Sequence, residues 1–255
     1  MILMALLMMF RQLNKNWISN MIDIKCLGSS SAGNAYRITD GHTALLLEAG
    51  FPYKSIQRAL NFRMTDIAGC LITHEHLDHS KAAPDIMRAG INIYTSAGTA
   101  AARGLAGHRL KVIKALEGFT IGTWTVLPFD IQHDVEEPLG FLLANTAGDK
   151  LVFLTDTYYC QHRFSGLTHI MVECNYSEDI VNERVAAGYL HPAQKKRLLR
   201  SHFSLENVKE MLKANDTRNV EEIWLLHLSD GNSDAERFKQ EIQETTGALV
   251  RVADR

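Results

Sequence analysis

The sequence has few cysteines and no paired cysteine motif. Four cysteines occur among 255 residues, at positions 26, 70, 160 and 174, and no C-x-x-C unit is present. Cys26, Cys70 and Cys174 lie in apolar runs, where a free cysteine behaves as a small hydrophobic residue. A reducing, cytoplasmic environment therefore suits the chain best.

Neither sign of charge dominates the sequence. The 27 lysines and arginines nearly balance the 29 aspartates and glutamates, giving a formal net charge of −2. No global positive field would draw in nucleic acid, so such a contact would need a local patch. The best candidate patch comprises Lys195, Lys196, Arg197 and Arg200. The alternative interpretation of these residues is a solvated helix face.

No apolar run is long enough to cross a membrane. Residues 1–10 are almost wholly apolar, whereas a span needs about 20 such residues. No basic region precedes them and no clear cleavage site follows, so they fit a signal peptide poorly. We expect residues 1–20 to be a dispensable extension. Because no Pro/Gly/Ser linker divides the remainder, residues 21–255 are predicted to form one domain without membrane contact.

The remaining pattern mixes strands and helices. Apolar runs predict strands at 22–27, 35–39, 43–47, 69–73, 92–95, 123–129, 139–144, 150–154, 169–174, 222–227 and 248–252. Helical periodicity predicts helices at 53–61, 80–89, 99–105, 180–188, 193–200, 205–213 and 234–246. A capping box at 233–236, with Ser233 first, suits the start of the last helix. Two sheets packed face to face with helices outside accommodate this α/β pattern.

Metal-binding side chains are concentrated directly after one buried strand. His74-Glu75-His76-Leu77-Asp78-His79 follows the apolar run 69–73. In an extended chain residues i and i+2 project to one side, so His74 and His76 can bind one ion. Asp78 and His79, at the turn, can face a second ion. Imidazole and carboxylate ligands suit zinc, manganese or iron in a catalytic site. The alternative interpretation of this segment is a polar turn with solvated histidines.

Three further candidate ligands follow later strands. His133, Asp156 and His227 each come just after an apolar run, where a rigid strand can present a side chain to a cleft. A single histidine at a strand end is more often structural, and Asp156 alone suits a turn cap. The candidate site depends on the whole set and on its order along the chain.

This order of ligands resembles that of the metallo-β-lactamase-fold hydrolases, over about residues 21–230. The resemblance implies an α/β fold, a four-layer αβ/βα sandwich, with two divalent metal ions, Zn²⁺ or Mn²⁺, between the sheets. By the family pattern, His74, His76 and His133 would bind one ion, and Asp78, His79 and His227 the other. Asp156 would bridge both ions.

Within the superfamily, the chain resembles in particular the bacterial exonuclease-like YycJ/WalJ group. The similar segments are a serine-rich turn at 28–34, the stretch 173–176 and two C-terminal motifs at 201–204 and 227–232. The resemblance implies substrate contacts at Ser30, Asn34 and Asn175. Glu48 stands where the family usually has Asp, as a residue that orients the metal ligands. Tyr176 stands where relatives tend to have His, which alters a substrate contact.

The implied chemistry is hydrolysis. A hydroxide shared by two ions would attack phosphorus or a carbonyl carbon, with Asp78 serving both the second metal and catalysis. His202 is the candidate general acid or phosphate contact, and an exposed loop histidine is the alternative. The turn 29–34 can present N–H groups to a phosphate. Its alternative interpretation is a simple tight turn with Gly33 at positive φ.

Two enzyme functions compete. The first is a metal-dependent phosphodiesterase on nucleic acid, a DNA exonuclease, which the group resemblance and the 195–200 cluster support. The second is a small-molecule ester hydrolase acting on a cyclic nucleotide, thioester or lactone, which the near-neutral charge favours. A non-enzymatic binding protein is disfavoured because all seven ligands are present. A secreted β-lactamase is disfavoured because no export signal is evident.

Overall fold

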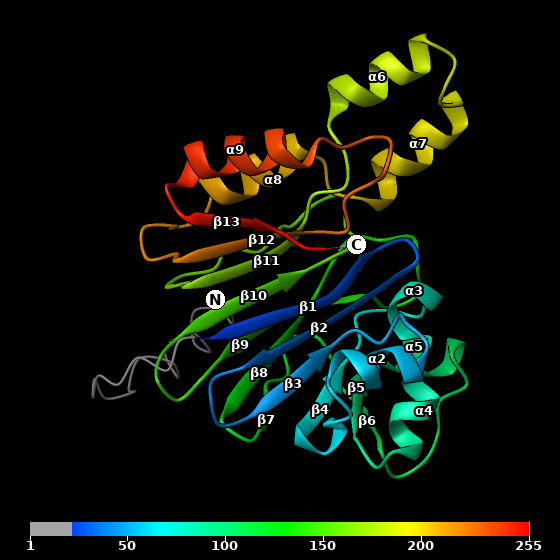
Figure 1. Ribbon diagram of the computed structural model, residues 1–255, viewed down its shortest axis with the longest axis vertical. Helices are drawn as coiled ribbons and strands as arrows, with labels where there is room; N and C mark the ends of the chain where they lie inside the picture. The colour runs from blue at the N-terminus through cyan, green and yellow to red at the C-terminus, as the bar shows by residue number, and fades with distance from the viewer. Residues whose placement is uncertain (1–21, 255) are drawn as a thin grey trace.

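The described part of the chain, residues 22–254, folds into two sheets flanked by helices. The structure is a computed structural model (Figure 1). The predicted extension at residues 1–20 lies outside the described residues. The first sheet is built from β1 Asp23–Ser30, β2 Gly33–Thr39, β3 Ala44–Leu47, β4 Ile67–Leu71, β5 Ile93–Thr95 and β6 Leu110–Val112. The second contains β7 Phe119–Ile121, β8 Trp124–Asp130, β9 Leu139–Ala144, β10 Lys150–Leu154, β11 His169–Glu173, β12 Glu222–Leu226 and β13 Leu249–Val252.

Each sheet combines antiparallel and parallel pairing. The first has the order β1-β2-β3-β4-β5-β6, antiparallel up to β3 and parallel beyond it. The second has the order β13-β12-β11-β10-β9-β8-β7, parallel from β13 to β10 and antiparallel from there to β7. Parallel neighbours need crossover connections, and helices supply most of them; the connection from β10 to β11, residues 155–168, is a loop.

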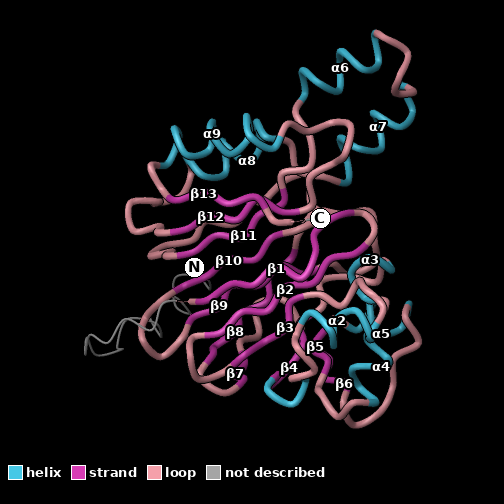
Figure 2. The backbone as a smooth tube through the Cα atoms, viewed as in Figure 1, coloured by secondary structure: helices cyan, strands magenta, loops and turns pink. Residues whose placement is uncertain are grey.

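Helices cover the outer face of each sheet. Against the first lie α2 Tyr53–Ala59, α3 Leu77–Ser80, α4 Ala83–Arg88 and α5 Ala97–Ala102; against the second lie α8 Leu205–Lys213 and α9 Ala235–Thr246. A 3₁₀ turn, Met64–Asp66, leads into β4. Figure 2 shows the two groups of helices on opposite sides of the paired sheets. The predicted four-layer αβ/βα sandwich is confirmed.

Alternating side chains of single strands fill three separate cores. Leu45 and Leu47 of β3 enter the core between the sheets, whereas Leu46 packs toward α2 and α4. In β10, Phe153 packs between the sheets and Val152 packs toward α8 and α9. Both faces of these strands are buried, which explains why their sequences are continuous apolar runs.

The structure corrects several predicted elements. Strands β6 and β7 are new, and the predicted helix 80–89 begins later, as α4, with Pro84 in its first turn; the short helix α3 precedes it. Proline suits a first turn and disfavours a helix interior. The residue that caps α9 is Asp234, which accepts a hydrogen bond from the N–H of Arg237; the predicted cap Ser233 instead donates to the Ser229 carbonyl.

Two helices project away from the sandwich. Between β11 and α8 the chain forms α6 Glu178–Ala186 and α7 Pro192–Ser201, which extend beyond the layers (Figure 1). The base of this projection is closed by hydrogen bonds from Asn175 N to Phe203 O, 2.9 Å, and from Leu205 N to Tyr176 O, 2.8 Å. No helix among residues 22–254 is long and apolar enough to cross a membrane.

Candidate metal centre

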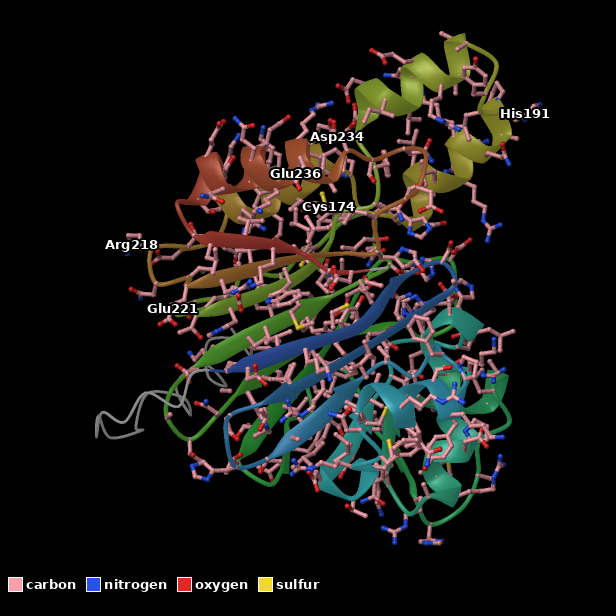
Figure 3. All side chains as sticks on the ribbon, viewed as in Figure 1. Cys174, His191, Arg218, Glu221, Asp234 and Glu236 are labelled. Carbon is pink, nitrogen blue, oxygen red and sulfur yellow. The ribbon has the colours of Figure 1, made fainter. Side chains whose placement is uncertain are left out.

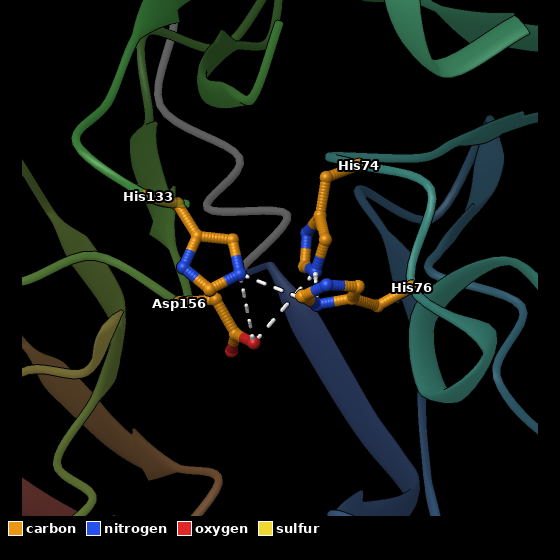
Figure 4. A group of neighbouring side chains, drawn as sticks. All are labelled: His74, His76, His133 and Asp156. Atoms are coloured by element: carbon orange, nitrogen blue, oxygen red, sulfur yellow. Dashed lines mark hydrogen bonds and ion pairs between the residues drawn. The ribbon is translucent and has the colours of Figure 1, made fainter. Parts of the chain in front are cut away.

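The candidate ligands gather where strands of both sheets end. His74 follows β4 of the first sheet, whereas Asp156 and His227 follow β10 and β12 of the second. In Figure 4, His74 and His76 come from one side and His133 and Asp156 from the other. The seven predicted ligands fall into two neighbouring groups that could each hold an ion: His74, His76, His133 and Asp156, and Asp78, His79 and His227.

The first group brings three imidazoles and one carboxylate together. His74, His76, His133 and Asp156 each offer an atom within 4.8 Å of the others. His76 Nδ1 lies 3.1 Å from His74 Nε2 and 3.3 Å from His133 Nε2. Burial lowers the pKa of His74 and of His133, so both rings favour the neutral form that binds metals. Three ring nitrogens converge on one point, and hydrogen bonds between the rings cannot satisfy all of them at once. A cation at this point would be bound by all three nitrogens.

The second group is richer in carboxylate. Asp78, His79 and His227 form it, and Asp78 Oδ2 lies 3.4 Å from His79 Nε2 and from His227 Nε2. Asp156 Oδ2 lies between the two groups, 3.3 Å from His79 Nε2 and 3.7 Å from His74 Nε2. One carboxylate oxygen is therefore shared by both groups, which is the position that a bridging ligand would need.

The electrostatics of the second group also fit a cation. Burial lowers the pKa of His227, but the carboxylates of Asp156, Asp78 and Glu173 outweigh it and raise this pKa to about 10. The pKa of His79 is raised too, because Asp156, Asp78 and Glu48 outweigh the effect of burial. Buried carboxylates demand positive charge, and a divalent ion can supply it in place of the histidine protons.

Backbone strain coincides with this centre. Glu48, Asp156 and His227 all have positive φ, at 63°, 46° and 53°. Non-glycine residues with positive φ are uncommon, and such strain clusters at functional sites. In each case the left-handed residue stands just beyond a strand end, so the chain leaves the sheet with the polar side chain aimed at the centre.

Glu48, the residue predicted to orient the metal ligands, lies beside His79. Its Oε1 accepts a hydrogen bond from the N–H of Thr73 at 3.2 Å. Its Oε2 lies 3.8 Å from His79 Nδ1, too far for a hydrogen bond, and both atoms are buried without a partner among the described residues. Burial raises the pKa of Glu48. The two buried polar atoms thus face each other, which is where a carboxylate that orients a ligating histidine would lie.

Glu173 is a site residue that the sequence analysis did not single out. It ends β11 and is fully buried; its Oε1 contacts His202 Nδ1 at 2.6 Å and lies 3.3 Å from His227 Nδ1. Glu173, His202, His227 and Asp156 form a third possible ligand group. The available signal was the one used for Asp156 and His227, a polar residue that closes an apolar strand.

His202 is mostly buried rather than exposed on a loop. It follows α7, and its ring stacks on that of His227 with centroids 5.4 Å apart and planes at 13°. Its side chain retains 22% exposure, so one edge stays open to solvent. A buried histidine with one open edge, held by a carboxylate, suits proton transfer.

The predicted substrate contacts have different surroundings. Asn34 is buried, with Nδ2 3.2 Å from His79 Nε2, and Asn175 Nδ2 donates to the His227 carbonyl at 2.7 Å. Ser30 is partly exposed, and its Oγ accepts from Ala32 N within the β1–β2 turn. All three therefore adjoin the second ligand group or the turn beside it.

Two details of the serine-rich turn and its neighbours differ from expectation. Gly33 does not have positive φ; a Cβ there would lie 2.9 Å from the Phe51 ring, so close packing explains this glycine. Tyr176 is buried and pairs through its backbone with Ser204, at the base of the helical projection. Ser29, in the same turn as Ser30, accepts a hydrogen bond from His227 N at 2.8 Å and so ties the turn to the metal centre.

Comparison with known proteins agrees with this fold and site. The family model of the Beta-lactamase superfamily domain matches residues 43–228. The chain is 28% identical over 225 residues to Exodeoxyribonuclease WalJ of Streptococcus pneumoniae, covering 81% of each chain. It is 26% identical over 229 residues to Exodeoxyribonuclease YycJ of Bacillus anthracis, covering 86% of each.

The fold likeness extends to a solved structure. The metallo-beta-lactamase fold protein YhfI from Bacillus subtilis superposes with a TM-score of 0.70 at 15% identity, covering 91% of this chain and 96% of that one. The predicted resemblance to the metallo-β-lactamase fold and to the YycJ/WalJ group is confirmed. A fold and a ligand order of this kind identify a hydrolase framework, and the chain belongs to the Beta-lactamase superfamily domain family.

Proposed function

We propose that this protein is a dinuclear metal-dependent phosphodiesterase that degrades DNA from an end. The observation that carries the proposal is the pair of ligand groups sharing one oxygen of Asp156, together with relatives named exodeoxyribonucleases over most of the chain. His74, His76 and His133 would hold one divalent ion, Asp78, His79 and His227 the other, and Asp156 both. Bound divalent ions, Zn²⁺ or Mn²⁺, would supply an ionised water and stabilise developing negative charge.

The protein's own residues prepare the rest of the reaction. His202 is proposed to donate a proton to the leaving oxygen, because its open ring edge faces the same space as His227 and His133. Glu173 holds His202 by Nδ1, which leaves Nε2 available for this transfer. Asp78 is proposed to serve catalysis by keeping His79 and His227 in place through one carboxylate oxygen. Ser30, Asn34 and Asn175 remain the proposed substrate contacts.

A small-molecule ester hydrolase is the second candidate, and one feature favours it. A groove beside His133 is lined by Glu75, Asp134 and Glu136, so a polyanion would meet negative charge on that side. A compact cyclic nucleotide, thioester or lactone would avoid most of this groove.

We also propose a cytoplasmic location, which the four free cysteines support.

The deciding experiment compares different substrates under the same metal conditions. Purified protein with measured metal content is incubated with end-labelled single-stranded and duplex DNA in Mn²⁺ or Zn²⁺. The same protein is tested on bis(p-nitrophenyl) phosphate, a cyclic nucleotide, a thioester and a lactone. We expect stepwise shortening of DNA, abolished by Asp78→Ala or His79→Ala and retained by Glu117→Ala, an exposed control. Absence of DNA cleavage by metal-loaded protein would overturn the nuclease assignment, and turnover of another ester would establish the second candidate.

A further inference from the structure

The helical projection carries an unusual charge pattern. Helix α7 has no acidic residue, and three of its cations, Lys196, Arg197 and Arg200, are exposed. Arg200 is four residues after Lys196 and three after Arg197, so it neighbours both on the helix surface and links the three into one basic face. None has a carboxylate partner among residues 22–254, whereas the neighbouring Lys195 donates to Asn182 Oδ1 at 2.5 Å. We name Lys196, Arg197 and Arg200 the α7 basic face.

Helix stability explains only part of this pattern. A cation in the last turn of a helix interacts favourably with the helix dipole, and Arg200 occupies that turn. Lys196 and Arg197 lie farther from the C-terminus, where this effect fades. Leu198 and Ser201 of the same helix are less exposed than these three cations. Charge repulsion among these three cations is therefore not offset by a carboxylate partner in the described part of the chain.

The basic helix runs directly into the metal centre. Figure 3 places His191, the first residue before α7, at the far end of the projection and Cys174 at its base. At the near end, the Ser201 carbonyl contacts His133 Nδ1 at 3.1 Å, and the next residue is His202. A ligand lying along the α7 basic face would thus have one end at the ligand groups.

Two exposed aromatic residues adjoin the same end of α7. Tyr158 and Tyr159 follow the bridging residue Asp156 and are 37% and 53% exposed. The residue before them is anchored beside the end of α7, because Thr157 N and Phe203 N both donate to Glu173 Oε2, at 3.2 and 3.1 Å. One buried carboxylate therefore joins the tyrosine segment to the residue that follows His202. We name Tyr158 and Tyr159 the tyrosine step.

We propose that the tyrosine step and the α7 basic face form one binding track for single-stranded nucleic acid. This proposal rests on the proposed phosphodiester chemistry and assigns the route by which the strand reaches it. Unpaired bases stack on exposed tyrosine rings, and phosphates pair with Lys196, Arg197 and Arg200. The acidic groove of Glu75, Asp134 and Glu136 beside His133 would repel the phosphates of the strand, whereas the α7 basic face would attract them.

The charge half of the track is tested by salt-dependent binding. The probe is a fluorescent 15-nucleotide single strand with phosphorothioate linkages, measured by anisotropy from 50 to 200 mM salt. Lys196→Gln/Arg200→Gln should weaken binding about tenfold and reduce the slope of log affinity against log salt by about 1.4, since each single-strand phosphate contact contributes about 0.7. The control Lys111→Gln/Lys114→Gln removes two exposed cations on and just after the edge strand β6 and should change neither value.

The stacking half is tested with ring variants. Tyr158→Ala/Tyr159→Ala should weaken single-strand binding about 5- to 150-fold for each stacked base, whereas Tyr158→Phe/Tyr159→Phe should retain it. A 15-base-pair duplex, whose bases are already stacked, should bind less tightly and respond less to the alanine change.

The outcomes separate this inference from the proposed function. If wild type cleaves DNA but Lys196→Gln/Arg200→Gln binds with an unchanged salt slope, the track is wrong and the nuclease stands. Equal losses in the Lys111→Gln/Lys114→Gln control, or no single-strand binding by wild type, also overturn the track. Wild type could also bind the single strand without cleaving DNA. If both Lys196→Gln/Arg200→Gln and Tyr158→Ala/Tyr159→Ala then weaken this binding, the track stands and the nuclease assignment does not.

Discussion

Single residues at the metal centre combine charge, burial and strain in one place. Asp156 shows this best, because it has φ of 46°, is buried and adjoins both ligand groups. Asparagine tolerates this backbone conformation, so Asp156→Asn removes the negative charge without adding strain. We expect metal content to fall and turnover to drop more than about 100-fold, above the loss typical of an outer-shell change. Elemental analysis and initial rates measure both, with exposed Asp216→Asn as the control.

The opposite end of the sandwich offers a pH-dependent stability contribution. Burial lowers the pKa of His169, which begins β11, so the folded state favours its neutral form. At acidic pH His169 therefore binds more protons in the unfolded chain than in the folded one. Its contribution to stability is fully present above the unfolded pKa of about 6.5 and is lost as the pH falls through the lower pKa of the folded state. The free energy of unfolding of wild type minus that of His169→Gln should therefore decrease from pH 7.5 to pH 5. Urea unfolding measures it, and an unchanged difference would contradict the assignment.

At the scale of single residues, sequence analysis identified side chains that can bind a metal ion directly. It did not identify those that act by holding another side chain in place. The convergence of the seven candidate ligands could be predicted because imidazole and carboxylate groups occur in a recognisable order along the sequence. Glu173 escaped notice because its role depends on His202 and His227, which meet it only in the folded chain. The cap of α9 was misplaced by one residue because Ser233 and Asp234 are both good caps.

Among the elements, the contact between the loop after β3 and helix α3 fixes the metal-binding turn. A Cβ on Gly50 would lie 1.7 Å from the Asp78 carbonyl oxygen, a backbone atom that cannot move alone. Gly50→Ala should therefore displace α3, destabilise the fold by about 1–3 kcal/mol and weaken metal binding. Gly118→Ala is the matched control, since its nearest neighbour would be 3.7 Å away, and its effect should stay within about 0.5 kcal/mol. Chemical denaturation with and without metal distinguishes the two variants.

Elements with a buried continuous run were the easiest to predict. The bounds of β9, β10 and α8 match the prediction, because their patterns are long and end at clear turns. Strands β6 and β7 have three residues each, too few for a periodic signal. The break between α3 and α4 depends on Ala82 N, which bonds to Ala49 O across the fold. Such a long-range contact is invisible to local pattern analysis.

For the whole molecule, the metal centre connects the two sheets. The first sheet supplies His74, His76, Asp78 and His79, and the second supplies His133, Asp156 and His227. Ions bound only by the folded state should stabilise it by about 4 kcal/mol when free metal exceeds Kd by a thousandfold. Chelation should lower Tm, and added Zn²⁺ or Mn²⁺ should restore it. The shift should be smaller in Asp156→Asn, and an equal Tm before and after removal of measured bound metal would contradict this coupling.

The closed base of the helical projection has a consequence for how this architecture can diversify. The chain leaves the sandwich at Asn175 and returns at Phe203, where backbone hydrogen bonds already join the outgoing and incoming segments. A segment inserted between two anchored points can lengthen, shorten or change composition at little entropic cost to the rest. Selection, or an engineer, can thus exchange the outer part of this appendage for another, provided that Ser201 and His202 at its base stay in place beside the ligand groups.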